Sequence, residues 1–115
     1  MCHVLIIEDE AIIAASIQMI LEGAGATSVD FADTEQQAVA AARNTRPKVI
    51  TSDVRLRVGT GPNAVKAIRD EHGHIPVIYI TSSPEECHGC DPDHIVPKPM
   101  SEARIEQLFL LFQER

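Results

Sequence analysis

Residues 4–10 read VLIIEDE, four apolar residues followed directly by three carboxylates. The apolar run is short and rich in branched side chains, which is typical of a strand buried in a sheet. Acidic side chains are costly to bury unless a partner neutralises them. Glu8 and Asp9, where this strand ends, therefore need a neutralising partner from elsewhere in the chain or from a bound cation.

The rest of the chain alternates between two kinds of segment. The expected strands are short, rich in branched apolar residues and bounded by turn or charged residues, at 3–8, 27–31, 47–51, 75–80 and 94–98. The segments between them show helical spacing, as at Ile13, Ile17 and Ile20. Helix starts are indicated by a capping-box pattern at Asp33 and Gln36, by Gly61-Pro62, and by Ser101.

This alternation determines the expected fold class. Strictly alternating strands and helices predict a parallel sheet covered on both faces, with right-handed crossovers. We predict one doubly wound, flavodoxin-like α/β domain over residues 1–115, with five strands in the order 2-1-3-4-5. A chain of 115 residues with 44% hydrophobic content is long enough for one such core.

In this topology the carboxyl ends of strands one and three lie together and form the functional crevice. Glu8 and Asp9 follow the first strand and Asp53 follows the third, so three acids should converge. Such a cluster favours a hard divalent cation, and Mg²⁺ shares its shell with water and phosphate oxygens. Thr81 and Lys98, after strands four and five, add a hydroxyl and an ammonium suited to phosphate chemistry.

These positions resemble the receiver domains of bacterial two-component response regulators. The family signature is an acidic pair, an Asp, a Thr or Ser and a Lys-Pro after strands one, three, four and five, here Glu8-Asp9, Asp53, Thr81 and Lys98-Pro99. The resemblance covers essentially the whole chain. With no output segment after residue 115, the chain is expected to be a stand-alone, single-domain regulator, although a removed effector domain is the alternative.

The resemblance implies a reaction and a cofactor. Asp53 would be the phosphoacceptor, attacking the phosphohistidine of a sensor histidine kinase or a phosphotransfer protein. Asp9 would bind Mg²⁺ directly, Glu8 would act through a water, and the Asp53 carboxylate and the backbone carbonyl of Arg55 would complete the protein ligands. Such a protein promotes its own phosphorylation and dephosphorylation but is not an enzyme acting on free substrates.

The resemblance also implies a switch. Lys98 would neutralise charge on the transferring phosphoryl group. Thr81 would donate its hydroxyl to that group once Asp53 is modified, and the movement would change binding to a downstream target protein. The family usually has an aromatic residue three positions before the lysine, where this chain has Ile95, and strand alternation gives no reason to regard Tyr79 as its substitute.

The segment between Thr81 and Lys98 is short for the family. Ser83, Pro84 and Glu86 form a helix-start pattern, but Gly89 can end the helix almost at once, so we expect a fourth helix of one or two turns. This puts the family's usual dimer surface in doubt, and a monomer or weak homodimer is expected. The last segment places Ile105, Leu108, Phe109 and Phe112 at core spacing and leaves Leu110 and Leu111 as core fill or as a partner patch.

Two other functions compete with the receiver. A pseudo-receiver would bind partners without phosphorylation, as the absent aromatic residue and short helix suggest. A phosphatase or other hydrolase of similar topology is the second competitor. One such class uses a nucleophilic Asp with a second Asp two residues later as acid/base, and Arg55 occupies that place here. The Arg55 side chain is expected either to shield the acyl phosphate or pair with a pocket acid, or to point outward from its loop.

Three cysteines in a chain with no secretion signal are expected to be reduced thiols. Cys87 and Cys90, with His88 between them and His94 beyond, could bind zinc or be redox-active, but ordinary residues are the default. The net charge of −7 and the absence of basic runs argue against nucleic acid or membrane binding. A cytoplasmic protein is expected.

Overall fold

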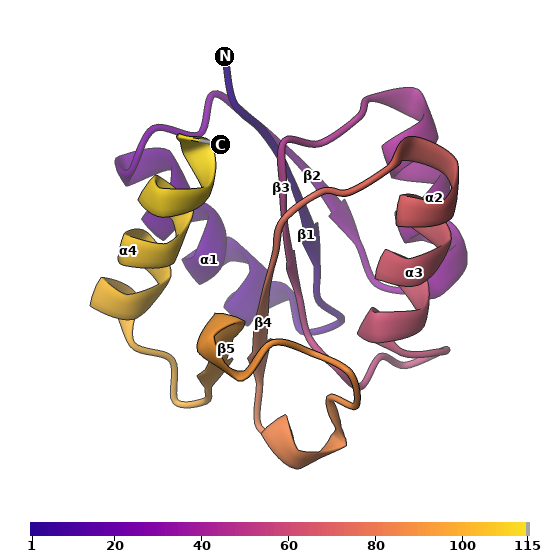
Figure 1. The fold of residues 1–115 in the computed structure, drawn as a ribbon. Coiled ribbons are helices and arrows are strands. Elements are labelled where there is room, and N and C mark those ends of the chain that lie inside the picture. The colour runs from indigo at the N-terminus through magenta and orange to yellow at the C-terminus, as the bar shows by residue number, and fades with distance from the viewer. Residues whose placement is uncertain (115) are drawn as a thin grey trace.

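The computed structural model describes residues 1–114 and contains five strands, four α-helices and two 3₁₀ turns (Figure 1). The strands are β1 (His3–Ile7), β2 (Ser28–Ala32), β3 (Val49–Ser52), β4 (Val77–Thr81) and β5 (Ile95–Pro97). The helices are α1 (Ala11–Gly23), α2 (Glu35–Asn44), α3 (Gly61–His72) and α4 (Glu102–Gln113), and the 3₁₀ turns are η1 (Pro84–Glu86) and η2 (Pro92–His94).

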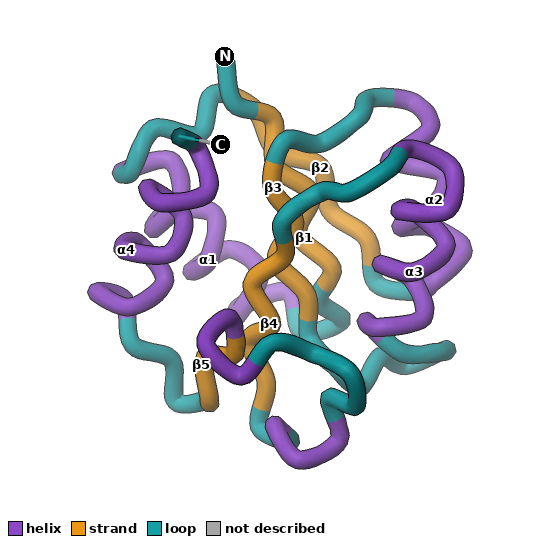
Figure 2. Tube along the Cα trace, in the orientation of Figure 1, coloured by secondary structure: helices purple, strands orange, loops and turns teal. Residues whose placement is uncertain are grey.

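The five strands, drawn in orange in Figure 2, form one sheet in the order β2-β1-β3-β4-β5, and the register makes every pair parallel. This confirms the predicted flavodoxin-like topology and strand order. Each expected strand is present, with ends that differ by at most two residues from the sequence-based limits. The order places β1 and β3 side by side at the centre of the sheet.

Helices cover both faces of the sheet, with α1 and α4 on one side and α2 and α3 on the other (Figure 1). The alternation of side chains along β1 divides the core accordingly. Val4 and Ile6 are buried in the cluster that includes α1 and α4, whereas Leu5 and Ile7 belong to the cluster beneath α2 and α3. An apolar strand without polar alternation is therefore buried on both faces.

The helix starts differ in part from the expected capping pattern. Ser101 caps α4 as predicted, because its hydroxyl accepts the Arg104 amide. The capping box at Asp33 was wrong by one residue, since Thr34 is the N-cap of α2 and accepts the Gln37 amide. Thr60 in the same way caps α3 ahead of Gly61-Pro62.

The apolar residues of α4 fall into two groups that differ in solvent exposure. Ile105, Leu108, Phe109 and Phe112 are buried, as their spacing predicts. Leu110 and Leu111 remain 43% and 48% exposed, so they are not core fill. Within residues 1–114, no helix combines the length and the apolarity needed to cross a membrane.

The segment between β4 and β5 is irregular. The expected short helix is reduced to the single 3₁₀ turn η1, and the Ser83 side chain does not cap it. A second turn, η2, leads into β5. Cys87 and Cys90 form a disulfide across the loop between the two turns, so the prediction of three reduced thiols was wrong and only Cys2 is a free thiol.

The start of β1 and the end of α4 lie at one edge of the sheet (Figure 1). The Gln113 side chain donates a hydrogen bond to the Ala24 carbonyl and so ties the end of α4 to the end of α1. The carboxyl ends of the strands lie at the opposite edge. Loops with chemistry-bearing residues therefore gather away from the ends of the described chain.

Candidate functional site

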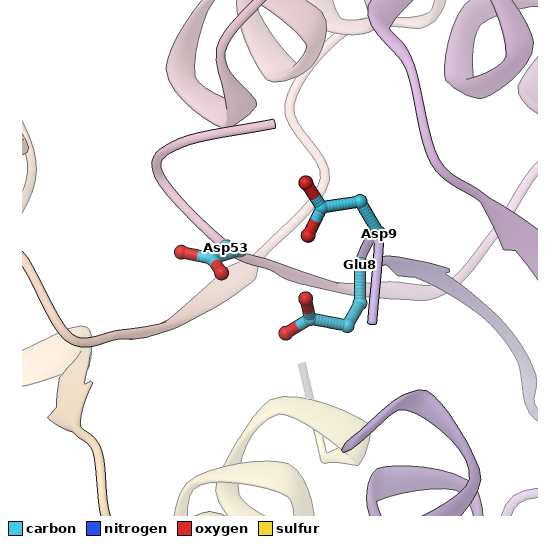
Figure 3. Close-up of side chains that lie close together, drawn as sticks. All are labelled: Glu8, Asp9 and Asp53. Atoms are coloured by element: carbon cyan, nitrogen blue, oxygen red, sulfur yellow. The ribbon is translucent and has the colours of Figure 1, made fainter. Parts of the chain in front are cut away.

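Three carboxylates meet where β1 and β3 end. The end of β3 is held against β1 by a 2.9 Å hydrogen bond from the Asp53 amide to the Ile7 carbonyl. Glu8, Asp9 and Asp53 each offer a carboxylate oxygen within 4.8 Å of the others (Figure 3). The predicted convergence of these acids is thus present in the structure.

The three acids differ in their environment. Glu8 and Asp53 are 5% and 8% exposed, whereas Asp9 is exposed to solvent. Burial raises the pKa of the Glu8 carboxyl, although hydrogen bonds from Lys98 and from the Glu10 amide oppose the change. The cluster therefore has an accessible acid at its rim and two enclosed acids that need a positive partner.

Lys98 supplies that partner. Its Nζ atom lies 2.9 Å from Glu8 Oε1 and 2.9 Å from Asp53 Oδ2. Burial alone would lower the pKa of Lys98, but the hydrogen bonds to Asp53 and Glu8 and their charges outweigh it and raise the pKa. The ammonium is therefore held in its charged form between the two enclosed carboxylates.

Thr81 completes the edge from β4. The register pairs it with Pro97, and the Lys98 amide donates to the Thr81 carbonyl at 2.8 Å, so the hydroxyl-bearing and lysine-bearing strand ends are fixed to each other. The Thr81 side chain is buried and its hydroxyl accepts the Ser83 amide at 3.0 Å. That bond uses an oxygen lone pair and leaves the hydroxyl proton available for donation.

Arg55 does not pair with an acid of the pocket. Its guanidinium Nε lies 3.2 Å from Glu86 Oε2 on η1, and both side chains are largely open to solvent. The part of the prediction that paired Arg55 with a pocket acid was therefore wrong, and the side chain reaches outward toward the segment after β4. The metal-ligand role of its backbone carbonyl stays a prediction.

Sequence reasoning missed the residues that position the loop after Asp53. Residues 54–60 form a small hairpin, and the Glu35 carboxylate accepts the Thr60 amide at 2.7 Å. Gly59 has a φ of +86°, and a Cβ there would lie 2.1 Å from the same carboxylate. Glu35, at the start of α2, therefore holds the hairpin in place. Because this contact joins distant parts of the chain, local sequence spacing could not have predicted it.

Gly61 is a second residue whose role the sequence did not reveal. A Cβ on Gly61 would lie 1.9 Å from the Asp53 carbonyl oxygen and 2.3 Å from the Ser52 hydroxyl. The start of α3 can therefore approach the end of β3 this closely only with glycine. The Gly-Pro pair in the sequence indicates a helix start, but not this close approach between α3 and β3.

Ile95 and Tyr79 lie opposite each other in the β4–β5 register. Tyr79 is buried and Ile95 is half-buried, and both belong to the core cluster on the α2–α3 side. Burial raises the pKa of the Tyr79 hydroxyl. The only tyrosine of the chain thus packs in the same region as the residue at the family's aromatic position.

The cysteine-rich loop does not form the zinc site considered from its sequence. Cys87 and Cys90 are bonded to each other. Across residues 1–114, Glu8, Asp9 and Asp53 make the one group of three or more side chains arranged to hold a metal ion. The candidate metal site therefore lies at the acidic edge of the sheet, and the cysteine-rich loop is not part of it.

Comparison with known protein families supports the same kind of site. The model of the response regulator receiver domain matches residues 4–109. The chain belongs to this family. As a receiver domain, it is similar to the phyllosphere-induced regulator PhyR of Methylorubrum extorquens, with 32% identity over 97% of this chain and 45% of the relative. The receiver domain thus spans less than half the length of that relative.

Solved structures give the same result. The receiver domain of the Erythrobacter litoralis PhyR response regulator has a TM-score of 0.86 and 28% identity, covering 98% of this chain and 90% of that one. The anti-anti-sigma factor PhyR from Bartonella quintana has a TM-score of 0.79 and 32% identity, covering 98% of this receiver domain and 48% of that protein.

Proposed function

We propose that this receiver domain accepts a phosphoryl group on Asp53 and that the modification switches its binding to a downstream protein. The donor is the phosphohistidine of a sensor histidine kinase or a phosphotransfer protein. The observation that carries the proposal is the enclosed Asp53 carboxylate, held 2.9 Å from the Lys98 ammonium and close to Glu8 and Asp9. The proposed setting is the cytoplasm.

In the proposed transfer, a carboxylate oxygen of Asp53 attacks phosphorus, the bond from phosphorus to the donor imidazole breaks, and an acyl phosphate forms. Asp53 Oδ1 accepts the Val54 amide at 2.7 Å, which fixes the orientation of the carboxylate. Lys98 lies against the other oxygen and can stabilise negative charge on the transferring group. Positioning and charge are most of what this chemistry needs.

The acidic cluster fits Mg²⁺, because carboxylate oxygens within 4.8 Å of one another are hard ligands with unbalanced charge. Glu8, Asp9 and Asp53 would hold the ion, together with the backbone carbonyl of Arg55. When bound, it supplies positive charge beside the phosphoryl oxygens. Asp9 is the acid most accessible to an ion arriving from solvent.

The switch that we propose begins at Thr81. Its free hydroxyl proton can be donated to a phosphoryl oxygen on Asp53, while its oxygen is already tied to the Ser83 amide. A shift of Thr81 toward Asp53 would therefore pull the start of the segment that contains η1. Local hydrogen bonding would in this way bias a surface element.

The downstream partner that we propose is a regulator of a sigma factor. The Bartonella quintana relative is described as an anti-anti-sigma factor, and this chain covers about half of that protein. The receiver domain would contribute the phosphorylation-dependent step of such partner switching. Isolated domains and longer chains would both use the same Asp53 chemistry.

A pseudo-receiver that works without phosphorylation is the second candidate. Ile95 at the family's aromatic position and the single turn of η1 favour it, because both alter the route from Thr81 to the surface. The intact constellation of Asp53 and Lys98 favours the phosphorylated receiver. The two candidates differ in whether Asp53 can be modified at all.

Intact-protein mass after incubation with Mg²⁺ and acetyl phosphate tests the proposal. We expect one metal-dependent phosphate adduct that disappears in Asp53→Asn. Asp70→Asn is the matched control, because Asp70 is an exposed acid paired with Lys66 on α3. No adduct with acetyl phosphate or with phosphorylated histidine kinases would rule out phosphoacceptance and leave the pseudo-receiver.

A further inference from the structure

The Cys87–Cys90 disulfide has no role in the proposed phosphoryl transfer. It lies between η1 and η2, in the segment where the sequence predicts a short helix of one or two turns. The two Cα atoms are 5.6 Å apart, a normal separation for a disulfide. The cross-link therefore fits the loop as it is folded.

The disulfide is also the apolar anchor of this segment. Cys87 is 8% exposed and lies in the same core cluster as Tyr79, and half-buried Cys90 packs against that cluster with Ile95. Neither Pro84, Glu85 nor Glu86 is buried. Residues 83–90 are thus attached to the core through the side chains of Cys87 and Cys90.

Other interactions of this segment are local or exposed. The Glu86 amide donates to the Ser83 carbonyl and the Cys87 amide to the Pro84 carbonyl, so both bonds close within one turn. The ion pair of Glu86 with Arg55 is largely open to solvent, where such pairs contribute little. The conformation of the segment therefore depends strongly on the cross-link.

We propose that Cys87–Cys90 is a thiol–disulfide exchange site for thiol and dithiol reductants, and that its redox state sets how freely residues 83–90 follow Thr81. The second half of this inference rests on the proposed function, because Thr81 matters only if Asp53 is phosphorylated. The first half concerns the cysteines alone.

The exchange is a balanced two-electron reaction. A thiolate of the reductant attacks Cys90 Sγ, the Cys87–Cys90 bond breaks, and Cys87 leaves as a thiolate that takes up a proton. A second thiolate of the reductant then attacks its own sulfur in the mixed disulfide and releases Cys90. The protein gains two electrons and two protons, and the dithiol reductant becomes a cyclic disulfide.

The surroundings of Cys90 suit this attack. Cys90 lines a hollow of about 240 Å³ whose wall includes Arg69, Tyr79 and His94, together with one acid, Asp91. Arg69 carries a permanent positive charge, which favours the approach of the reductant's thiolate, the reactive form of a thiol. The greater exposure of Cys90 compared with Cys87 makes it the sulfur that an incoming reagent meets first.

Thiol counting tests the exchange site. The native protein is treated with dithiothreitol, quenched with acid, denatured and alkylated, and its mass is measured. Oxidised protein should take up one alkyl group, at Cys2, and reduced protein three. Cys2→Ala is the matched control. Its oxidised form should take up no alkyl group and its reduced form two.

We expect native reduction to be slower than reduction of the denatured protein by less than about a hundredfold. A slower native rate would show an inert structural disulfide and overturn the proposal. Three free thiols after treatment with glutathione disulfide would overturn it as well, because the pair would then not form.

Hydrogen exchange and phosphoryl lifetime test the coupling. After reduction, the Cys87 and Cys90 amides should exchange faster by on the order of tenfold, because their turns lose the cross-link. The lifetime of phosphorylated Asp53 should also differ between the oxidised and reduced forms. The Cys87→Ser/Cys90→Ser double variant should match the reduced form and ignore dithiothreitol.

Equal exchange rates or equal lifetimes in the two redox forms would overturn the coupling. If Asp53 accepts no phosphate, the proposed function fails, yet thiol counting and hydrogen exchange still decide the redox site. The two failures can therefore be distinguished.

Discussion

The two halves of the sheet edge are built in different ways. On one side, strands β1 and β3 in register bring Glu8, Asp9 and Asp53 together. On the other, the segment that follows Thr81 is shaped by two short turns and a disulfide. Long-range strand pairing holds the first side, whereas local bonds and one cross-link hold the second.

This difference separates chemistry from signalling. The acidic side must hold its charged groups in one fixed arrangement for phosphoryl transfer, and rigid strand ends suit that task. The segment after Thr81 must change its conformation, and weakly anchored elements open at low free-energy cost. The predictions that follow test the rigidity of the first side, from the largest expected effect to the smallest.

Gly61→Ala should disrupt the acidic side most strongly. The new methyl group would lie 1.9 Å from the Asp53 carbonyl oxygen, so β3 and α3 would have to separate. We expect a loss of about 3 kcal/mol in the free energy of unfolding, measured by urea denaturation. Gly23→Ala is the control, because a Cβ added at this position would meet no atom within 4 Å. This variant should be as stable as the parent or more stable.

Lys98→Met should come next. It removes the shared partner of Glu8 and Asp53, whose side chains are 1% and 10% exposed. We expect a loss of about 2 kcal/mol at pH 7, together with loss of phosphorylation. In contrast, Lys66→Met breaks only an exposed pair and should change stability by less than about 0.5 kcal/mol. Equal effects of the two variants would contradict the enclosed ion pairs.

Glu35→Ala should have a smaller effect, confined to the hairpin after Asp53. The Thr60 amide loses its acceptor, and we expect a loss of about 1 kcal/mol with faster exchange of that amide. Glu35→Gln retains a carbonyl oxygen and should restore much of the protection. If Glu35→Ala also weakens Mg²⁺ binding, the Glu35–Thr60 contact helps to position the Arg55 carbonyl. Unchanged exchange of the Thr60 amide in Glu35→Ala would contradict a stabilising role of this contact.

Glu8→Gln should have the smallest effect and the opposite sign. Folding raises the pKa of Glu8, so its favourable contribution is complete below the unfolded pKa of about 4.3 and is lost as the pH rises through the folded pKa. Without metal, the variant should therefore be more stable than the parent at pH 7. The gap should close as the pH falls toward 4 in a series of urea denaturations. A gap that is constant with pH would exclude this cause.

The sequence allowed the acidic side to be predicted and the other side only in part. Periodicity places Glu8 and Asp53 at neighbouring strand ends, because strand identity and parallel order together determine which ends meet. For Leu110 and Leu111 the spacing allows either core fill or a partner patch, and their exposure excludes core fill. Spacing along the chain was sufficient wherever a regular element determined position.

Residues in irregular segments were less predictable. Thr34 rather than Asp33 caps α2, because neighbouring polar residues compete for the same position. The bond between Cys87 and Cys90 depends on loop geometry, which two cysteines three positions apart do not determine. Glu35 reaches its partner at Thr60 only through the tertiary fold.

The positions of the chain ends have a practical consequence. The start of β1 and the end of α4 lie opposite the carboxyl ends of the strands (Figure 1), and Asp53 directly follows β3 at those carboxyl ends. A surface tether or a fluorescent reporter attached at either end would leave the acidic edge open to a phosphodonor. Two dyes, one at an end and one in the loop after Thr81, could therefore report motion of that loop while the reaction proceeds at the far side of the tether.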